Sequence, residues 1–310
     1  MKPYHLIVSG YSSFDHMLKL LSPAVVGKTS LIANSSCSKT FWGGCSVNIA
    51  VALSRLGLKV LTVLRVGDDF ESSGFKNFLQ EEGISLDAIT HIPDETNPRA
   101  FLLQDPEGEH ITTFYPGAMD ERYFSPYPDT WFENSEAALM TVASYKDNLE
   151  FLQKVRKYQI PLFFGMKGDF SAFPPDMLEE IFRESAILFM NRTESEQLVE
   201  LMELNSIEDV FSIGKAEVLV ITLGSDGSRY IARDGSSETV PAVKIEHVVD
   251  TTGGGDGFIS GFLYGYFTGL SYKECCQYGS LVSSFVLEAE GCTTNLPDLG
   301  QLLKRKQERG

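Results

Sequence analysis

The greatest concentration of chemistry-bearing residues lies at residues 250–258, which read DTTGGGDGF. Three glycines, Gly253, Gly254 and Gly255, let the backbone turn and leave no side chain in the way of a ligand. Apolar residues follow at helical spacing, so the glycines are predicted to begin a helix. Free amides and the positive end of the helix dipole meet there and create a site for an anion. Asp256 falls in the first turn, where the plain alternative is that it only caps the helix.

A second glycine pair stands before another predicted helix. Gly43 and Gly44 precede the amphipathic stretch 46–57 and allow a ligand to approach the backbone closely. Asn48, in the first turn, both donates and accepts hydrogen bonds and therefore suits hydroxyl groups. The alternative interpretation is an ordinary loop at the start of a helix.

Two further motifs come where apolar strands end. Asn191 and Glu194 follow the run AILFM and share one face of a helical turn. The carboxyl edge of a parallel sheet, where they stand, is where α/β proteins bind ligands. Glu194 would equally serve as an ordinary first-turn carboxylate. Thr222, Gly224 and Gly227 belong to TLGSDG, a strand end that turns into a hairpin and by itself indicates only a turn.

Strands and helices must position these motifs, and apolar runs alternate with helical patterns along most of the chain. Six runs have the non-alternating apolarity of strands buried on both faces, at residues 4–9, 59–66, 137–143, 160–165, 186–190 and 217–222. Helical patterns lie at 46–57, 70–83, 147–158, 175–185, 193–203, 206–214, 255–268, 271–289 and 298–308. This rhythm predicts the α/β class, with a doubly wound, mostly parallel sheet flanked by helices.

Two segments interrupt the rhythm. Residues 29–42 and 98–115 have the pattern of solvent-facing strands and hairpins. The sequence PEGE at 106–109 predicts a turn between two strands. Both segments are therefore expected to be β structure added to the α/β core.

We expect this added structure to form a small β lid. It would comprise approximately residues 12–42 and 96–118, within one α/β domain that spans residues 1–310. Exposed edge strands invite pairing with another chain, so a homodimer formed through the lid is expected.

Composition bounds the class of protein. The chain has 310 residues, with 26 basic and 42 acidic side chains and a formal net charge of −16. This balance argues against a nucleic-acid partner, which needs a basic surface. Apolar residues at 43% and charged residues at 22% are globular values and exclude wholesale disorder. The basic tail at 304–306 is expected to be a solvated helix end.

Several other classes of site and location find no support. Five cysteines without CxxC spacing favour reduced thiols in a cytoplasm over a disulfide framework or a zinc site. No run approaches the ~18 apolar residues of a membrane span, and the apolar run at the start is shorter than a secretory signal requires. We therefore expect a cytoplasmic protein with no membrane partner. Residues 25–29 imitate a P-loop without its first glycine, and no complete GxGxxG follows the first strand.

Taken together, the motifs resemble those of the ribokinase-like (phosphofructokinase-B type) family of carbohydrate and nucleoside kinases. GGCSVNIAVALSRLG, followed by VGDDF, is similar to the family's N-terminal signature, and DTTGGGDGFISGF is similar to its C-terminal signature. NRTE is similar to the NxxE motif, and TLGSDG to the nucleotide-side TxGxxG motif. They occur in family order and cover nearly the whole chain.

The resemblance implies an ATP-dependent phosphotransferase with an alcohol group as acceptor. Asp256 would be the general base, and the amides of Gly253, Gly254 and Gly255 would hold the charge that builds on the transferred phosphoryl group. The expected partner is a small sugar or nucleoside.

The same resemblance assigns the remaining candidate residues. The acceptor would be held by Asp15, Gly44 and Asn48, and Phe114 would contact an apolar moiety such as a base. The ATP side would be lined by Asn191, Thr222, Gly224 and Gly227. Glu194 would organise Mg²⁺ through water. Asp250 would mark a site for a monovalent cation such as K⁺.

Within the family, TFYPGAM at 113–119 looks like the bacterial adenosine kinases of ribokinase type. A purine nucleoside, accepting at its primary 5′ hydroxyl, is therefore the expected acceptor. Ala100 stands where those enzymes carry an aromatic residue, and Gly168 and Asp169 stand where they carry glutamines. These departures keep a second alternative open, a kinase of another sugar or polyol such as ribose or fructose. A silent ligand-binding relative is the third, although Asp256 and the glycines are all present.

Overall fold

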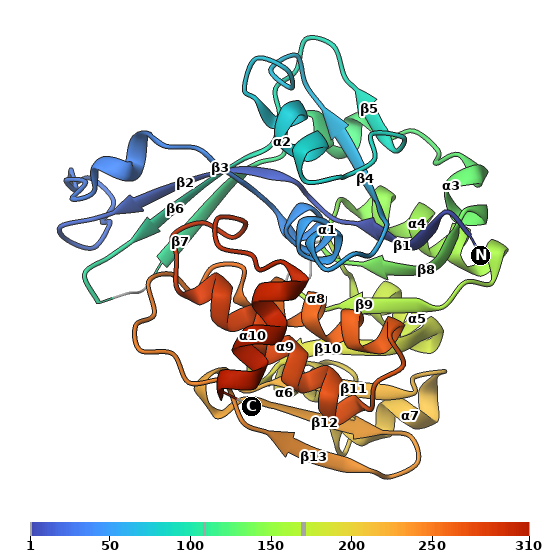
Figure 1. Cartoon of the computed structure of the whole chain (residues 1–310). Helices are drawn as coiled ribbons and strands as arrows, with labels where there is room; N and C mark the ends of the chain where they lie inside the picture. The colour runs from blue at the N-terminus through green and yellow to red at the C-terminus, as the bar shows by residue number, and fades with distance from the viewer. Residues whose placement is uncertain (1, 108–109, 169–171, 310) are drawn as a thin grey trace.

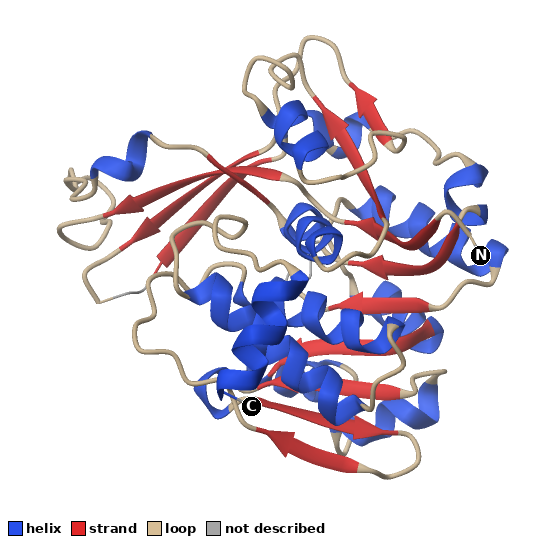
Figure 2. Ribbon diagram, in the orientation of Figure 1, coloured by secondary structure: helices blue, strands red, loops and turns tan. Residues whose placement is uncertain are grey.

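The computed structural model describes residues 2–107, 110–168 and 172–309, and within them the strands form two sheets (Figures 1 and 2). The large sheet has nine strands, whose order across the sheet is β13 (Ser237–Val240), β12 (Ser228–Ala232), β11 (Val218–Thr222), β10 (Ser185–Asn191), β9 (Leu162–Gly165), β8 (Ser135–Met140), β1 (Tyr4–Ser9), β4 (Val60–Val66) and β5 (Ile89–His91). Neighbours from β11 to β5 pair in parallel, and β12 is antiparallel to both of its neighbours. The prediction of a mostly parallel sheet is confirmed.

Helices cover both faces of the large sheet (Figure 1). Their bounds are α1 (Cys45–Arg55), α2 (Phe75–Glu81), α3 (Asp129–Glu133), α4 (Tyr145–Tyr158), α5 (Pro175–Glu184), α6 (Arg192–Leu201), α7 (Val210–Ile213), α8 (Gly254–Phe267), α9 (Tyr272–Leu287) and α10 (Leu299–Arg309). Short 3₁₀ helices lie at Ser35–Ser38, Gly117–Met119, Glu121–Tyr123, Ile207–Asp209 and Gly224–Asp226. The doubly wound arrangement follows from this two-sided cover.

The sheet has an apolar core on each face because successive strand residues point to opposite sides. Leu6 and Val8 pack in the core that contains α1, α8 and α9, whereas Ile7 between them packs with α4 and α5. Phe163 and Phe164 divide between the two cores in the same way. All five side chains have 0% exposure. This two-sided burial explains why these strands read as continuous apolar runs.

A smaller sheet projects from the side to which the parallel strands point (Figure 1). It has the order β3 (Phe41–Gly43), β2 (Ser13–Lys19), β6 (Arg99–Gln104) and β7 (His110–Tyr115). We call these four strands the small sheet. The four strands lie within the two segments predicted to form a lid, residues 12–42 and 96–118, except for Gly43 at the end of β3. Residues 108 and 109 of the predicted turn lie outside the described residues.

Glycines let α8 lie unusually close to α9. Gly257, Gly261 and Gly265 are spaced four apart and therefore share one face of α8. A Cβ on Gly261 would lie 2.2 Å from the carbonyl oxygen of Tyr278, and one on Gly265 would lie 3.0 Å from the Cα of Cys275. This close packing against α9 holds α8 in place, and with it the glycine-rich motif at its start.

Several local predictions were wrong. Most of 29–42 is loop with a 3₁₀ helix, and only Phe41–Gly43 is a strand in the small sheet. The helix predicted over 70–83 is confined to Phe75–Glu81, because turns occupy the residues before Gly74. The pattern at 206–214 forms a 3₁₀ turn followed by the four-residue α7. Short apolar periodicity alone does not carry a full helix, since nucleating one is costly.

Two further properties bear on the sequence analysis. Among the described residues, no helix has both the length and the apolar character that a membrane crossing needs. All five cysteines are free thiols, and Cys275, Cys276 and Cys292 are buried.

Candidate active site

The glycine-rich motif begins α8 as predicted. Gly253 is the N-cap residue and has φ +77°, a conformation that side-chain-bearing residues rarely adopt. A Cβ there would lie 2.8 Å from the Sγ of Cys292, and one on Gly254 would lie 3.2 Å from Leu287. A Cβ on Gly255, by contrast, would meet no atom within 4 Å. Packing therefore explains the first two glycines, whereas Gly255 borders open space at the positive end of the helix.

Asp256 is buried and joins two distant parts of the chain. The residue is 3% exposed. Oδ2 accepts a hydrogen bond from Nδ2 of Asn48 at 2.8 Å, and Oδ1 lies 3.2 Å from Nζ of Lys167. Because the N-cap position belongs to Gly253, the interpretation of Asp256 as a mere helix cap is wrong. Its side chain faces the interior between α1 and the end of β9.

Asn48 and Asp15 line the other side of Asp256. Asn48 lies in the first turns of α1, and its Oδ1 is buried without a hydrogen-bond partner among the described residues. Such an acceptor is costly to bury, so it points to a donor supplied by a ligand. Asp15 lies on β2 and is buried beside it: a Cβ on Gly43 would lie 2.6 Å from the Asp15 carboxylate and 3.3 Å from Oδ1 of Asn48. Gly43 thus lies between two polar groups that a side chain would separate.

Asp15 is a strongly perturbed carboxyl group. Burial, together with the nearby carboxylates of Asp250 and Asp256, raises its pKa to about 6, and a hydrogen bond from the Ser13 hydroxyl opposes this shift. A buried polar cluster of this kind is typical of a binding or catalytic site.

Gly44 connects this cluster to an aromatic pair. It has φ +90°, and a Cβ on it would lie 2.3 Å from the carbonyl oxygen of Tyr11. The Tyr11 ring packs against Phe114 of β7, with centroids 4.9 Å apart, and Phe114 is 41% exposed. Ala100 pairs with Phe114 in register and is buried, whereas Phe101 on the opposite face stacks on His16. Phe114 is thus a half-exposed aromatic residue close to the polar cluster.

Asn191 and Glu194 bond to each other at the start of α6. Oδ1 of Asn191 accepts from the Glu194 amide at 2.8 Å, and Oε2 of Glu194 accepts from the Asn191 amide at 2.8 Å. This reciprocal pair is a capping box, so Glu194 does act as a first-turn carboxylate. Burial raises the pKa of Glu194, against opposing effects of the Asn191 amide and of Lys167.

Residues from several of the motifs and strand ends line a small cavity of about 70 Å³. Its lining includes Lys167, Asn191, Glu194, Thr222 and Gly255. It therefore lies between the start of α8 and the carboxyl ends of β9, β10 and β11. The predicted anion site and two of the predicted nucleotide-side residues, Asn191 and Thr222, share this space.

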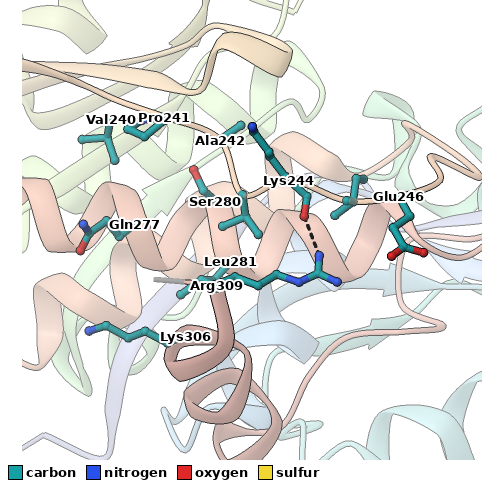
Figure 3. A pocket seen from close by; sticks show the side chains of 12 residues that line it. Val240, Pro241, Ala242, Lys244, Glu246, Gln277, Ser280, Leu281, Lys306 and Arg309 are labelled. Carbon is teal, nitrogen blue, oxygen red and sulfur yellow. Dashed lines mark hydrogen bonds between the residues drawn. The ribbon is translucent and has the colours of Figure 1, made fainter.

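A larger cavity of about 780 Å³ lies between the loop after β13, α9 and α10 (Figure 3). Gly227 abuts that loop, because a Cβ on it would lie 2.1 Å from the carbonyl oxygen of Val240. Gly224, in the same motif, has φ +61° and open space around it. The hairpin motif thus stands next to the large cavity, while its first residue, Thr222, lines the small one.

Asp250 accepts two backbone hydrogen bonds. They come from the amide of Thr252 at 2.9 Å and from the amide of Gly291 at 3.2 Å. Within the described residues, no group of three or more His, Cys, Asp or Glu side chains is arranged to hold a metal ion. A divalent ion at this site would need phosphate and water as its main ligands, and a single carboxylate such as Glu194 fits the way that proteins hold Mg²⁺ beside nucleotides.

Sequence reasoning missed two parts of the site. Lys167 was visible only as a lone lysine after the apolar run LFFGM, at a strand end equivalent to that of Asn191. The basic tail was expected to be solvated, which holds for the exposed Lys304 only: Lys306 lines the large cavity, and Arg305 lies over the Phe285 ring at 3.3 Å. Gly168 is exposed, and Asp169 lies outside the described residues.

Comparison with known proteins agrees with this geometry. The pfkB family of carbohydrate kinases matches residues 11–299. A nucleoside kinase of Methanocaldococcus jannaschii is 30% identical over 271 residues, which cover 87% of each chain. The crystal structure of a nucleoside kinase from the same organism has a TM-score of 0.88 at 27% identity and covers 98% of this chain and 99% of that one.

Two further solved structures share the fold at lower identity. A nucleoside kinase of Burkholderia thailandensis in complex with inosine has a TM-score of 0.85 at 22% identity, covering 98% of both chains. Arabidopsis thaliana ribokinase complexed with ribose and ATP has a TM-score of 0.83 at 22% identity, covering 97% of this chain and 98% of that one. The ribokinase-like fold expected from the sequence is confirmed. This chain belongs to the pfkB family of carbohydrate kinases and is a phosphotransferase, of the sugar and nucleoside kinase class, with an alcohol group as acceptor.

Proposed function

We propose that this protein is an ATP-dependent nucleoside kinase that phosphorylates the primary 5′ hydroxyl of a purine nucleoside. The observation that carries the proposal is the polar cluster around Asp256, which has an aromatic wall beside it. Buried Asn48 leaves its Oδ1 without a partner among the described residues, as a substrate hydroxyl would require, and the part-exposed Phe114 ring, packed against Tyr11, offers an apolar surface close by.

Asp256 is the general base of the proposed reaction. Its carboxylate takes the proton of the acceptor hydroxyl while that oxygen attacks the γ-phosphorus of ATP. The bond between the γ-phosphorus and the bridging oxygen breaks, and ADP leaves with the electron pair. The backbone at Gly253, Gly254 and Gly255 faces the developing negative charge, with Gly255 closest to open space. The Gly254 amide donates to the carbonyl oxygen of Thr251 before ligand arrives.

The acceptor is oriented by groups from α1 and the small sheet. Asn48 and the Asp15 carboxylate receive hydrogen bonds from ribose hydroxyls, and Gly44 lets the sugar approach the backbone. Phe114 packs against the base, which an aromatic face binds without requiring a particular hydrogen-bond pattern. In this arrangement a purine gains stacking area that a bare sugar lacks.

ATP lies along the carboxyl edge of the sheet. We place its adenosine moiety in the large cavity and its phosphates toward the small one, past Gly227, Gly224 and Thr222. Asn191 and Glu194 border the phosphate end. Mg²⁺ bound to the phosphates would neutralise part of their charge, and Glu194 would hold it through water. Asp250 is the proposed carboxylate of a monovalent cation site near residue 291, where it already accepts two amides.

The substrate proposal is tested by comparing kcat/KM for adenosine, inosine and guanosine with that for ribose, fructose and inositol. We expect a purine nucleoside to lead. A sugar whose kcat/KM exceeds that of every nucleoside about a hundredfold would identify the protein as a sugar kinase. The feature that favours this alternative is Ala100, a small side chain paired with Phe114 where a second aromatic residue would help to bind a base. No turnover of any acceptor would point to a silent relative.

We also propose that the small sheet pairs with its copy in a homodimer. Within the described residues its β7 edge pairs with no further strand, and Leu31, Ile111 and Phe101 are exposed on or beside it. Sedimentation equilibrium of the wild type and of Ile111→Lys tests this proposal. A dimer that dissociates in the variant supports it, and a wild-type monomer at high concentration contradicts it.

A further inference from the structure

The candidate site contains a cation that the sequence motifs do not include. Lys167 follows β9 by two residues, and parallel pairing of β9 with β10 sets it level with Asn191. The backbone there is fixed by the bond from the Met166 amide to the Phe189 carbonyl oxygen at 2.9 Å. Lys167 therefore stands at the sheet edge where the nucleotide-side residues gather.

The ammonium group faces both the base and the small cavity. Nζ lies 3.2 Å from Oδ1 of Asp256, and the side chain also lines the cavity with Glu194 and Gly255. It is the only lysine or arginine among the described residues that line this cavity. The Asp256 carboxylate and the Cys45 thiol nearby raise the pKa of Lys167 above its usual value, so the group is charged at neutral pH.

An ion pair to its carboxylate weakens a general base, because the pair stabilises the anion that must accept a proton. The phosphates of ATP are stronger attractors for an ammonium group than one carboxylate, since they carry more charge. An entering γ-phosphoryl group, held at the start of α8, would compete for the lysine and leave the Asp256 carboxylate free to face the acceptor. Lys167 contacts Asp256 and also lines the cavity at the start of α8, so its ammonium group needs only a short movement to pass from one to the other.

We infer that Lys167 is a further catalytic residue, whose ammonium group passes from Asp256 to the transferred phosphoryl group. The inference rests on the proposed function of the site. In the reaction the acceptor oxygen bonds to the γ-phosphorus, the bond to the leaving ADP oxygen breaks, and the hydroxyl proton goes to Asp256. Lys167 neither gains nor loses a proton: it stabilises the charge on the phosphoryl oxygens throughout.

The test compares a triphosphate with a diphosphate in the absence of acceptor. β,γ-imido-ATP and ADP, each with excess Mg²⁺, are titrated calorimetrically into the wild type and Lys167→Met. A lysine that contacts the γ-phosphoryl group predicts about tenfold or greater weakening for the triphosphate analogue. ADP affinity should change much less. Equal weakening for both nucleotides, or none for either, would overturn the inference.

Two further variants complete the design. Lys167→Arg retains the charge and should retain part of the preference for the triphosphate. Lys215→Met is the matched control, because Lys215 pairs with Glu184 at 2.7 Å on the surface, away from both cavities. We expect it to bind both nucleotides as the wild type does.

A measurement on the wild type covers a Lys167→Met variant that fails to fold. Nuclear magnetic resonance of protein labelled with ¹⁵N-lysine should show the Lys167 Nζ signal shifting when β,γ-imido-ATP binds and changing little when ADP binds. Equal shifts with both nucleotides contradict the inference. Because neither readout uses an acceptor, a wild type that phosphorylates no nucleoside would refute the proposed function while the role of Lys167 is still decided by nucleotide binding.

Discussion

The start of α8 and the small sheet both contribute to the polar cluster around Asp256 and Asp15 but are built in opposite ways. At the start of α8, Asp256 is 3% exposed, a Cβ on Gly253 would collide with Cys292, and one on Gly254 would be tight against Leu287. The small sheet has only a minor apolar cluster, formed by Met17, Ala100 and Leu102 with Phe41 against it. Tight packing holds side chains in one geometry, whereas a thin sheet tolerates changes in its residues, which in the proposed function choose the acceptor.

The largest expected effect comes from Asp256→Asn. This variant tests whether Asp256 acts in catalysis or only supports the structure at the start of α8. Asn keeps the size of Asp but accepts no proton, so kcat should fall by roughly 10²–10⁴. Lys167 is one-third exposed, so water can solvate its ammonium when the carboxylate is gone. We expect ADP binding and the thermal midpoint to change little, whereas a triphosphate analogue, which no longer competes with the Asp256 carboxylate for Lys167, should bind more tightly. Near-normal turnover in a coupled ADP-release assay would contradict the proposed mechanism.

Asp15→Asn tests whether the small sheet carries a charge that opposes folding. Burial, with the carboxylates of Asp250 and Asp256, raises the pKa of Asp15 to about 6, so its ionised form costs the folded state about 2–3 kcal/mol above that pH. The variant should therefore melt several degrees higher at pH 7.5. The gain should shrink as the pH falls through 6 and vanish below about 4, where the carboxyl group is protonated in both folded and unfolded chains.

Melting temperatures measured from pH 3.5 to 8 check this prediction. Asp176→Asn is the control, because Asp176 is exposed in the first turn of α5 and should show no such gain. A stabilisation by Asp15→Asn that does not depend on pH would show that packing, rather than the buried charge, limits stability at this point.

Phe114→Ala should change acceptor choice while leaving the start of α8 intact. If Phe114 contacts a purine, KM for adenosine should rise about tenfold, since stacking on a base contributes roughly 1–3 kcal/mol. KM for ribose should barely change. Phe101→Ala is the matched control, because Phe101 lies on the other face of the small sheet against His16. Equal effects of the two variants on adenosine would remove Phe114 from the acceptor site.

The smallest effect is expected for Glu194→Gln, which leaves most of the capping geometry in place. If the Glu194 carboxylate organises Mg²⁺ through water, the variant should need a few-fold more magnesium for half-maximal rate. Acceptor KM should stay constant. Glu196→Gln, exposed on the same helix, serves as the control. An unchanged magnesium dependence would leave Glu194 with its capping role alone.

Features that depend on contacts between residues close in the sequence were predicted, whereas those that depend on distant residues were not. The start of α8 was predicted because Gly253 to Asp256 are adjacent, and their chemistry is that of a local helix terminus. β2 was not predicted as a separate strand. Its residues, SFDHMLK, mix polar and apolar types, and its pairing partner β6 lies some eighty residues further along the chain. A strand of this kind is stabilised by its neighbour rather than by its own pattern.

By itself, the sequence determined the α/β class, the anion-binding helix start and the family, because buried strands and glycine motifs leave local signatures in the residue pattern. Only the tertiary structure decided that Asp256 meets Asn48, 208 positions away, and Lys167, 89 positions away. No periodicity encodes such contacts, since they depend on how strand ends and helix starts converge at one edge of the sheet. The spacing of residues along the chain therefore identifies the motifs of the site, whereas the fold sets which charged groups lie next to one another there.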